Sequence, residues 1–156
     1  MKIIFPIIFI ILVLFLQIGI LPRLAILGAF PNLILISVLS LVILRGWKKN
    51  LGWIVAAGLF FDFYSSRNIL GISVLIILVI SIIVQFLSQK FFKKTDNLSI
   101  FLVFLAGLII YEIVHLSFPI SLIRIIYDLI FVLPIFHILK FYVGKIAQIQ
   151  GQKEIF

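Results

Sequence analysis

Long apolar runs with almost no charge inside them are the feature that most constrains this chain. Six such runs follow one another, separated by short polar or basic segments. The chain is 65% hydrophobic and 12% charged, whereas soluble domains are usually about 25% charged. A soluble domain of 156 residues has too little interior to hide so much apolar surface. The pattern therefore predicts a membrane protein, in which each crossing helix needs about 20 mostly apolar residues.

The apolar runs predict an all-α protein with six transmembrane helices. They form one domain, residues 1–147, followed by a short cytoplasmic tail, residues 148–156. The expected spans are residues 3–21, 24–44, 50–66, 69–89, 98–118 and 121–143. The third is the shortest and crosses only with the help of its flanks. The first follows Lys2 as in a signal peptide, but no small-x-small cleavage site follows it, so we expect it to remain as a helix.

Basic residues gather on one side of this topology. With the N-terminus inside, ten of the thirteen Lys and Arg residues are cytoplasmic, namely Lys2, Arg45, Lys48, Lys49, Lys90, Lys93, Lys94, Lys140, Lys145 and Lys153. Arg23, Arg67 and Arg124 fall on the other side. Because positive residues flank the cytoplasmic ends of membrane helices, both termini are expected in the cytoplasm. This rule also accounts for the net charge of +8 without a nucleic-acid partner.

Five ionisable residues within or at the ends of the expected spans are the candidate site: Asp62, Glu112, His115, Arg124 and Asp128. An ionisable group inside a membrane is costly, so each marks a position with a function or a partner. Helical rise places Asp62 roughly 18 Å and Glu112 roughly 21 Å from the cytoplasmic end. Arg124 and Asp128 lie roughly 5 and 11 Å from the outer end. All four therefore fall in the outer half of a core about 30 Å thick.

The shared depth predicts a polar network in which Asp62 or Glu112 pairs with Arg124, with Asp128 and His115 around it. Buried pairs can fix helix packing without chemistry, and we favour this interpretation over a proton relay or a ligand site. Another alternative is that Asp62, near the outer end of a short helix, reaches interfacial water. His115 and Glu112 are too few to bind a metal ion.

The sequence has no cysteine and no motif of a catalytic or cofactor-binding centre. A nucleophile beside a base, a phosphate-binding glycine loop and a zinc-protease helix are all missing. We therefore expect neither enzymatic activity nor a cofactor or metal ion. Gly52-x-x-x-Ala56 is a small-residue pair that would let another helix approach closely.

The middle of the chain resembles a bacterial membrane protein family. Its markers stand in the order Pro31-Asn32, Arg45-Gly46, Gly52, Ala57-Gly58-Leu59-Phe60-Phe61-Asp62 and Leu70-Gly71. This order is similar to that of MreD, the rod-shape-determining protein, over roughly residues 31–86. The motif residues of this chain are Pro31, Asn32, Gly52, Gly58, Asp62 and Gly71. Asn32 stands where the family often has Asp, and Val55-Ala56 stands where Gly-Phe is common.

The resemblance implies a non-enzymatic scaffold subunit of the cell-elongation (rod-shape, peptidoglycan synthesis) machinery in the bacterial cytoplasmic membrane. Its implied partners are MreC, RodA with a class B penicillin-binding transpeptidase, and indirectly MreB, besides membrane lipid. It also implies a six-helix fold like that of the substrate-binding subunits of energy-coupling-factor vitamin transporters. Such a solute-binding subunit is the alternative function, although residues 3–21 contain no alanine for the Ala-x-x-x-Ala docking face of those subunits. A small membrane enzyme ranks last.

Overall fold

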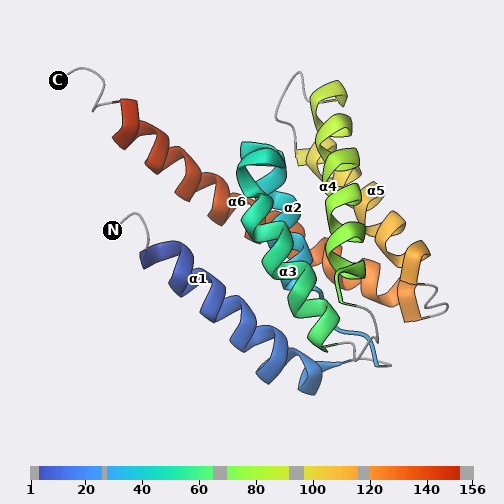
Figure 1. Ribbon diagram of the computed structural model, residues 1–156. Coiled ribbons are helices and arrows are strands. Elements are labelled where there is room, and N and C mark those ends of the chain that lie inside the picture. The colour runs from blue at the N-terminus through green and yellow to red at the C-terminus, as the bar shows by residue number, and fades with distance from the viewer. Residues whose placement is uncertain (1–3, 26–27, 65–69, 92–96, 116–119, 152–156) are drawn as a thin grey trace.

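The computed structural model describes residues 4–25, 28–64, 70–91, 97–115 and 120–151, which form an all-helical bundle (Figure 1). The six longest helices are α1 (Ile4–Phe15), α2 (Leu33–Arg45), α3 (Leu51–Tyr64), α4 (Ile72–Phe91), α5 (Asn97–His115) and α6 (Ile120–Gly151). A π turn, η1 (Leu16–Ile20), and a 3-10 turn, η2 (Leu21–Leu24), extend α1, and a 3-10 turn, η3 (Lys48–Asn50), leads into α3. The predicted all-α class is confirmed.

Three of the described helices are long and apolar enough to cross a membrane. They lie at Ile72–Lys90 in α4, Asn97–Val114 in α5 and Leu122–Lys145 in α6. α2 and α3 have 13 and 14 residues, so each rises only about 20 Å. The membrane character predicted from composition is therefore supported by α4, α5 and α6, while the six-span topology remains a prediction.

The second helix begins at Leu33, so the predicted start at residue 24 is wrong. Gly28 has a φ of +79°, which favours glycine, and the chain from there to Asn32 is not helical. Asn32 then starts α2, because its Oδ1 accepts a hydrogen bond from the Leu35 N–H at 3.1 Å. Ala29, Pro31 and Asn32 are buried. The residues next to the start of α2 are thus covered by protein, as irregular backbone within a membrane would have to be.

α2 is the central helix of the bundle. Every residue from Leu33 to Val42 is buried, and α2 packs against α3, α4 and α6. The core continues between α5 and α6, where the Phe104 and Phe136 rings meet edge-to-face with centroids 6.2 Å apart. A helix that is apolar all round belongs in such an interior position.

α3 and α4 form a closely packed hairpin. A Cβ atom on Gly58 would lie 2.4 Å from the Val74 Cα, so only glycine allows this approach. Gly71, just before α4, has a φ of +98°. The two glycines let α3 and α4 run side by side with a tight entry into α4.

α6 is longer than predicted. It continues to Gly151, so the expected tail 148–156 begins as helix, and residues 152–156 lie outside the described part. The C-terminal part of α6 extends toward the upper left of Figure 1, on the same side as the start of α1.

Candidate functional site: a polar cavity where four helices begin or end

A polar cavity of about 240 Å³ lies where α1 and α3 end and α2 and α4 begin. Side chains from η1, from the segment before α2, and from α3 to α6 line it: Gln17, Phe30, Asn32, Phe60, Phe61, Tyr64, Ser73, Tyr111 and Arg124. Five of the nine are aromatic. Two aromatic contacts hold the wall, since Phe60 stacks on Tyr64 at 5.9 Å and Phe61 meets Tyr111 at 6.2 Å between ring centroids.

Asp62 is not part of the cavity lining, and its carboxylate caps the start of α4. Its Oδ2 accepts a hydrogen bond from the Gly71 N–H at 2.6 Å, and its Oδ1 accepts one from the Ser73 N–H at 3.0 Å. The residue is 1% exposed. The first N–H groups of a helix have no partner within the helix, and a carboxylate there also opposes the positive end of the helix dipole. Asp62 therefore fastens the end of α3 to the beginning of α4.

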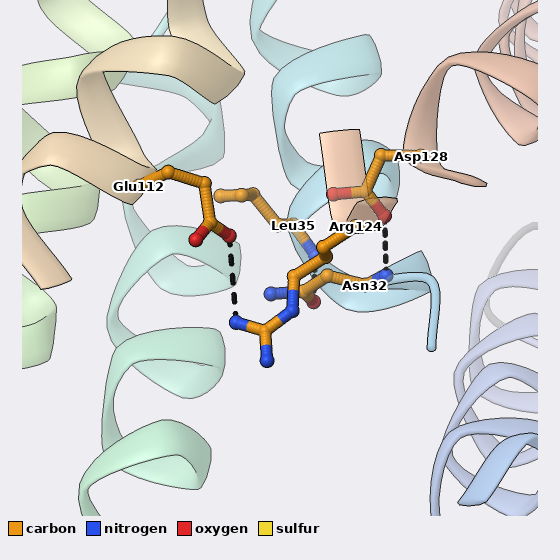
Figure 2. Close-up of polar contacts among 5 residues, drawn as sticks. All are labelled: Asn32, Leu35, Glu112, Arg124 and Asp128. Atoms are coloured by element: carbon orange, nitrogen blue, oxygen red, sulfur yellow. Dashed lines mark hydrogen bonds and ion pairs between the residues drawn. The ribbon is translucent and has the colours of Figure 1, made fainter. Parts of the chain in front are cut away.

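Asp128 binds the backbone at the start of α2, as Asp62 does at the start of α4. Its Oδ1 accepts a hydrogen bond from the Asn32 N–H at 2.5 Å (Figure 2). Asp128 belongs to α6 and is fully enclosed, so this bond joins the longest helix to the central one across 96 residues of sequence. Gln17 adds a third acceptor, because its Oε1 accepts from the Leu33 N–H at 2.8 Å.

Arg124 forms its ion pair with Glu112. Nη1 of Arg124 and Oε1 of Glu112 are 3.4 Å apart, and the pair joins α6 to α5 (Figure 2). Of the two acids that the sequence offers to Arg124, Glu112 is thus the one paired in the structure. The side chain of Glu112 is 4% exposed and that of Arg124 is 24% exposed. Among the described residues, the second oxygen of Glu112, Oε2, has no hydrogen-bond partner.

Four of the five predicted site residues make the following contacts among the described residues, and a single network of all five stays a prediction. Asp62 contacts the start of α4, Asp128 contacts the start of α2, and Glu112 contacts Arg124. His115 is the last residue of α5, and its side chain lies outside the described part. The depth argument placed these residues at one end of the bundle, but it could not show that two of the acids bind backbone N–H groups.

The predicted site omits Gln17, Ser73, Tyr64 and Tyr111. The first two are uncharged polar residues, and Tyr64 and Tyr111 carry hydroxyls, so a search for ionisable groups that titrate near neutral pH passes over all four. Gln17 gave one usable signal, since it is the only amide within the apolar stretch 3–21. Ser73 follows Gly71 at the start of α4, and nothing in its sequence surroundings marks it.

An apolar hollow of about 340 Å³ adjoins the polar cavity. It lies among α1, α2 and α3, and its lining includes Phe9, Val13 and Leu14 from α1 and Phe60 from α3. Phe60 also lines the polar cavity, so the two spaces are neighbours across this residue. The polar cavity offers a ligand hydrogen-bond donors and aromatic faces, and the apolar hollow beside it offers hydrocarbon surface.

No metal-binding group is present in the part of the chain that the structure describes, because no three His, Cys, Asp or Glu side chains gather there. Comparison of the chain with protein-family models, with curated proteins and with solved structures finds no match in any of the three.

Proposed function

We propose that this protein is a non-enzymatic membrane scaffold subunit of the bacterial cell-elongation machinery, similar to MreD. It binds MreC and neighbouring membrane subunits, RodA with its transpeptidase among them, and reaches MreB indirectly. It spans the cytoplasmic membrane six times with both termini in the cytoplasm.

The observation that carries the proposal is the position of the motif residues. Asn32 caps α2 and donates its N–H to Asp128. Gly58 allows α3 to pack closely against α4. Asp62 caps α4, and Gly71 forms the turn before that helix. Four of the six motif residues, Asn32, Gly58, Asp62 and Gly71, therefore lie where α2, α3, α4 and α6 are joined. A shared motif that builds the helix joints supports a shared fold more strongly than a shared apolar composition does.

The distribution of charge supports the topology. The exposed residues Lys48 and Lys49 precede α3, and exposed Lys90 lies at the end of α4. Both places lie at the top of Figure 1, opposite the polar cavity. Because positive residues favour the cytoplasmic side, the polar cavity is assigned to the outer half.

A partner helix has a suitable surface on α3. Gly52 and Ala56 are exposed, and a Cβ on Gly52 would meet nothing within 4 Å. Small residues on a lipid-facing surface allow close backbone approach, which gives the dispersion contacts that drive helix association in lipid. We assign the exposed surface around Gly52 to a partner transmembrane helix.

The experiment is a mild-detergent purification of the tagged chain from its native membranes, with mass spectrometry of the co-purifying proteins. The proposal expects MreC, or RodA with its transpeptidase. Gly52→Leu should reduce this recovery, whereas Gly144→Leu should not, since Gly144 is also exposed with open space around it but lies near the end of α6. Equal recovery with both variants would refute the assigned surface, and absence of these partners would refute the function.

A solute-binding subunit of an energy-coupling-factor transporter is the second candidate, and the polar cavity is the observation that favours it. The same purification separates the two functions. Recovery of paired ATPases with a coupling membrane subunit would establish the transporter function in place of the scaffold function.

A further inference from the structure

The polar cavity presents hydrogen-bond donors. The amide oxygens of Gln17 and Asn32 accept hydrogen bonds from the Leu33 and Leu35 N–H groups, respectively. These bonds identify the other terminal atom of each amide as the NH2 nitrogen. Neither NH2 group bonds to a described residue. Arg124 has guanidinium N–H groups beyond the one that faces Glu112, and guanidinium has no acceptor.

Ser73 adds a buried hydroxyl to the same wall. Ser73 is 2% exposed, and its Oγ has no hydrogen-bond partner among the described residues. A buried polar atom without a partner costs free energy, so a ligand that pairs with it binds more tightly.

The nearby carboxylates already have donors of their own, so they do not occupy the donors in the cavity wall. Asp62 and Asp128 accept backbone N–H groups, and Glu112 faces Arg124. The groups left over in the wall are the two amide NH2 groups, the Ser73 hydroxyl and the remaining guanidinium N–H groups. A ligand with several acceptor oxygens and negative charge fits this set.

The apolar hollow lies beside the polar cavity, and both share the lining residue Phe60. On α1 the lining runs from Phe9 through Leu14 and leads to Gln17 in η1. On α2 it runs from Leu41 to Ile34, with Asn32 just beyond. α3 contributes to both spaces in the same order, from Trp53 to Tyr64.

The length of the hollow suits one hydrocarbon chain. From Trp53 to Phe63 the axis of α3 rises about 15 Å, which is half of a hydrocarbon core about 30 Å thick. A chain from one leaflet can therefore lie in the hollow while its head group enters the polar cavity.

We propose that the two adjoining spaces together bind one amphiphile, a hydrocarbon chain that carries an anionic phosphate. The phosphate oxygens accept hydrogen bonds from Arg124, Ser73 and the amides of Gln17 and Asn32. The chain lies among α1, α2 and α3, and the Phe60 ring separates head from chain. Glycerophospholipids and isoprenyl phosphates share this chemistry.

The test is native mass spectrometry of the full chain in detergent, titrated with dioleoyl phosphatidic acid. Dioleoylglycerol serves as the chain without phosphate, and inorganic phosphate serves as the head without chain. One phosphatidic acid should bind at a concentration at least about tenfold lower than dioleoylglycerol requires, since a hydrogen bond to a charged group is worth at least that factor.

Two serine variants test the head group without loss of folding. Ser73→Ala should weaken binding about tenfold, because it removes one donor to the phosphate. Ser81→Ala is the matched control: Ser81 is on the same helix, 0% exposed, and its Oγ likewise has no partner among described residues, but it does not line the cavity. It should bind phosphatidic acid as the unaltered chain does.

Two alanine variants test the chain site. Ala56→Trp fills the hollow beside α1 and should abolish one-to-one binding. Ala106→Trp fills a separate apolar hollow of about 210 Å³ beside α5 and should leave binding unchanged. Farnesyl phosphate in competition with phosphatidic acid then identifies the preferred source, and either ranking agrees with the proposal.

Three results would overturn it. The first is equal affinity for dioleoylglycerol and phosphatidic acid, and the second is unchanged binding in Ser73→Ala. The third is displacement of the lipid by inorganic phosphate at equal concentration, which would show that the hollow contributes nothing.

Discussion

At the scale of the residue, Asp62 stands among aromatic side chains because α4 needs an acceptor where it begins. Solvent can satisfy the first N–H groups of an exposed helix, but Ser73 at the start of α4 is buried, so its N–H needs an acceptor from the protein. Asp62 supplies two oxygens to Gly71 and Ser73 within a setting of Phe60, Phe61 and Phe63. The carboxylate is thus explained by the backbone of the next helix.

Replacement of Asp62 should destabilise the bundle through this cap. We expect Asp62→Ala to lower the free energy of unfolding by about 2 kcal/mol, as the loss of two buried bonds at a helix start implies. Asp62→Asn keeps one acceptor oxygen and should lose less. Denaturation by sodium dodecyl sulfate from mixed micelles, followed by circular dichroism, measures the difference. Identical curves for Asp62→Ala and the unaltered chain would show that the cap is not needed.

The Glu112–Arg124 pair should respond unequally to the loss of either partner. Arg124→Met leaves Glu112, which is 4% exposed, as an uncompensated buried charge, and should cost about 3–5 kcal/mol. Glu112→Gln leaves Arg124, which is 24% exposed and can reach water, and should cost less.

The double variant completes the comparison. Arg124→Met combined with Glu112→Gln should be more stable than Arg124→Met alone, because no buried charge remains unpaired. The same denaturation assay measures all three variants. Additive losses would mean that the two side chains do not interact.

At the scale of the element, the α3–α4 hairpin depends on one missing methyl group. The contact between these two helices is the most extensive in the bundle, and Gly58 lies against the Val74 backbone within it. Gly52 lies on the same helix, one and a half turns away, and faces open space. The two glycines therefore have different tasks although both belong to the motif.

The pair gives a matched test of close packing. Gly58→Ala places a Cβ 2.4 Å from the Val74 Cα, so α3 and α4 must separate, at a cost of about 1–3 kcal/mol or more. Gly52→Ala meets nothing within 4 Å and should be neutral or slightly stabilising, since alanine favours the helix. Thermal unfolding in detergent measures both. Equal melting temperatures would contradict the close approach.

At the scale of the whole molecule, the proposed topology places the end of α3 outside and the start of α5 inside. Leu70 and Asn97 are exposed positions next to these two places, and neither carries charge. The chain has no cysteine, so a single introduced cysteine reports its own side without background.

Cysteine labelling in intact cells tests this orientation. A membrane-impermeant maleimide should modify Leu70→Cys in whole cells and Asn97→Cys only after permeabilisation. Both variants leave the basic residues in place, so the charges that set the orientation are unchanged. The reverse pattern would invert the topology and move the polar cavity to the cytoplasmic side.

The sequence by itself determined the all-helical class of the protein, the apolar character of its helices and the end of the bundle at which the polar residues gather. These follow from run length, helical rise and the placement of basic residues, which are local properties. It could not place α2 at the centre, because every membrane helix is apolar all round and periodicity does not separate a lipid-facing helix from a buried one. The same limit hid the late start of α2 at Leu33.

The tertiary structure alone decided which acid meets which donor. Asp62, Glu112 and Asp128 have the same chemistry and similar depth, yet the structure pairs them with the α4 backbone, Arg124 and the α2 backbone respectively. The reason is physical: helix N–H groups without intrahelical partners compete with Arg124 for the carboxylates, and only the positions of the helix ends settle that competition. The position of a donor-lined cavity beside an apolar hollow likewise arises only when α1, α2 and α3 are packed together.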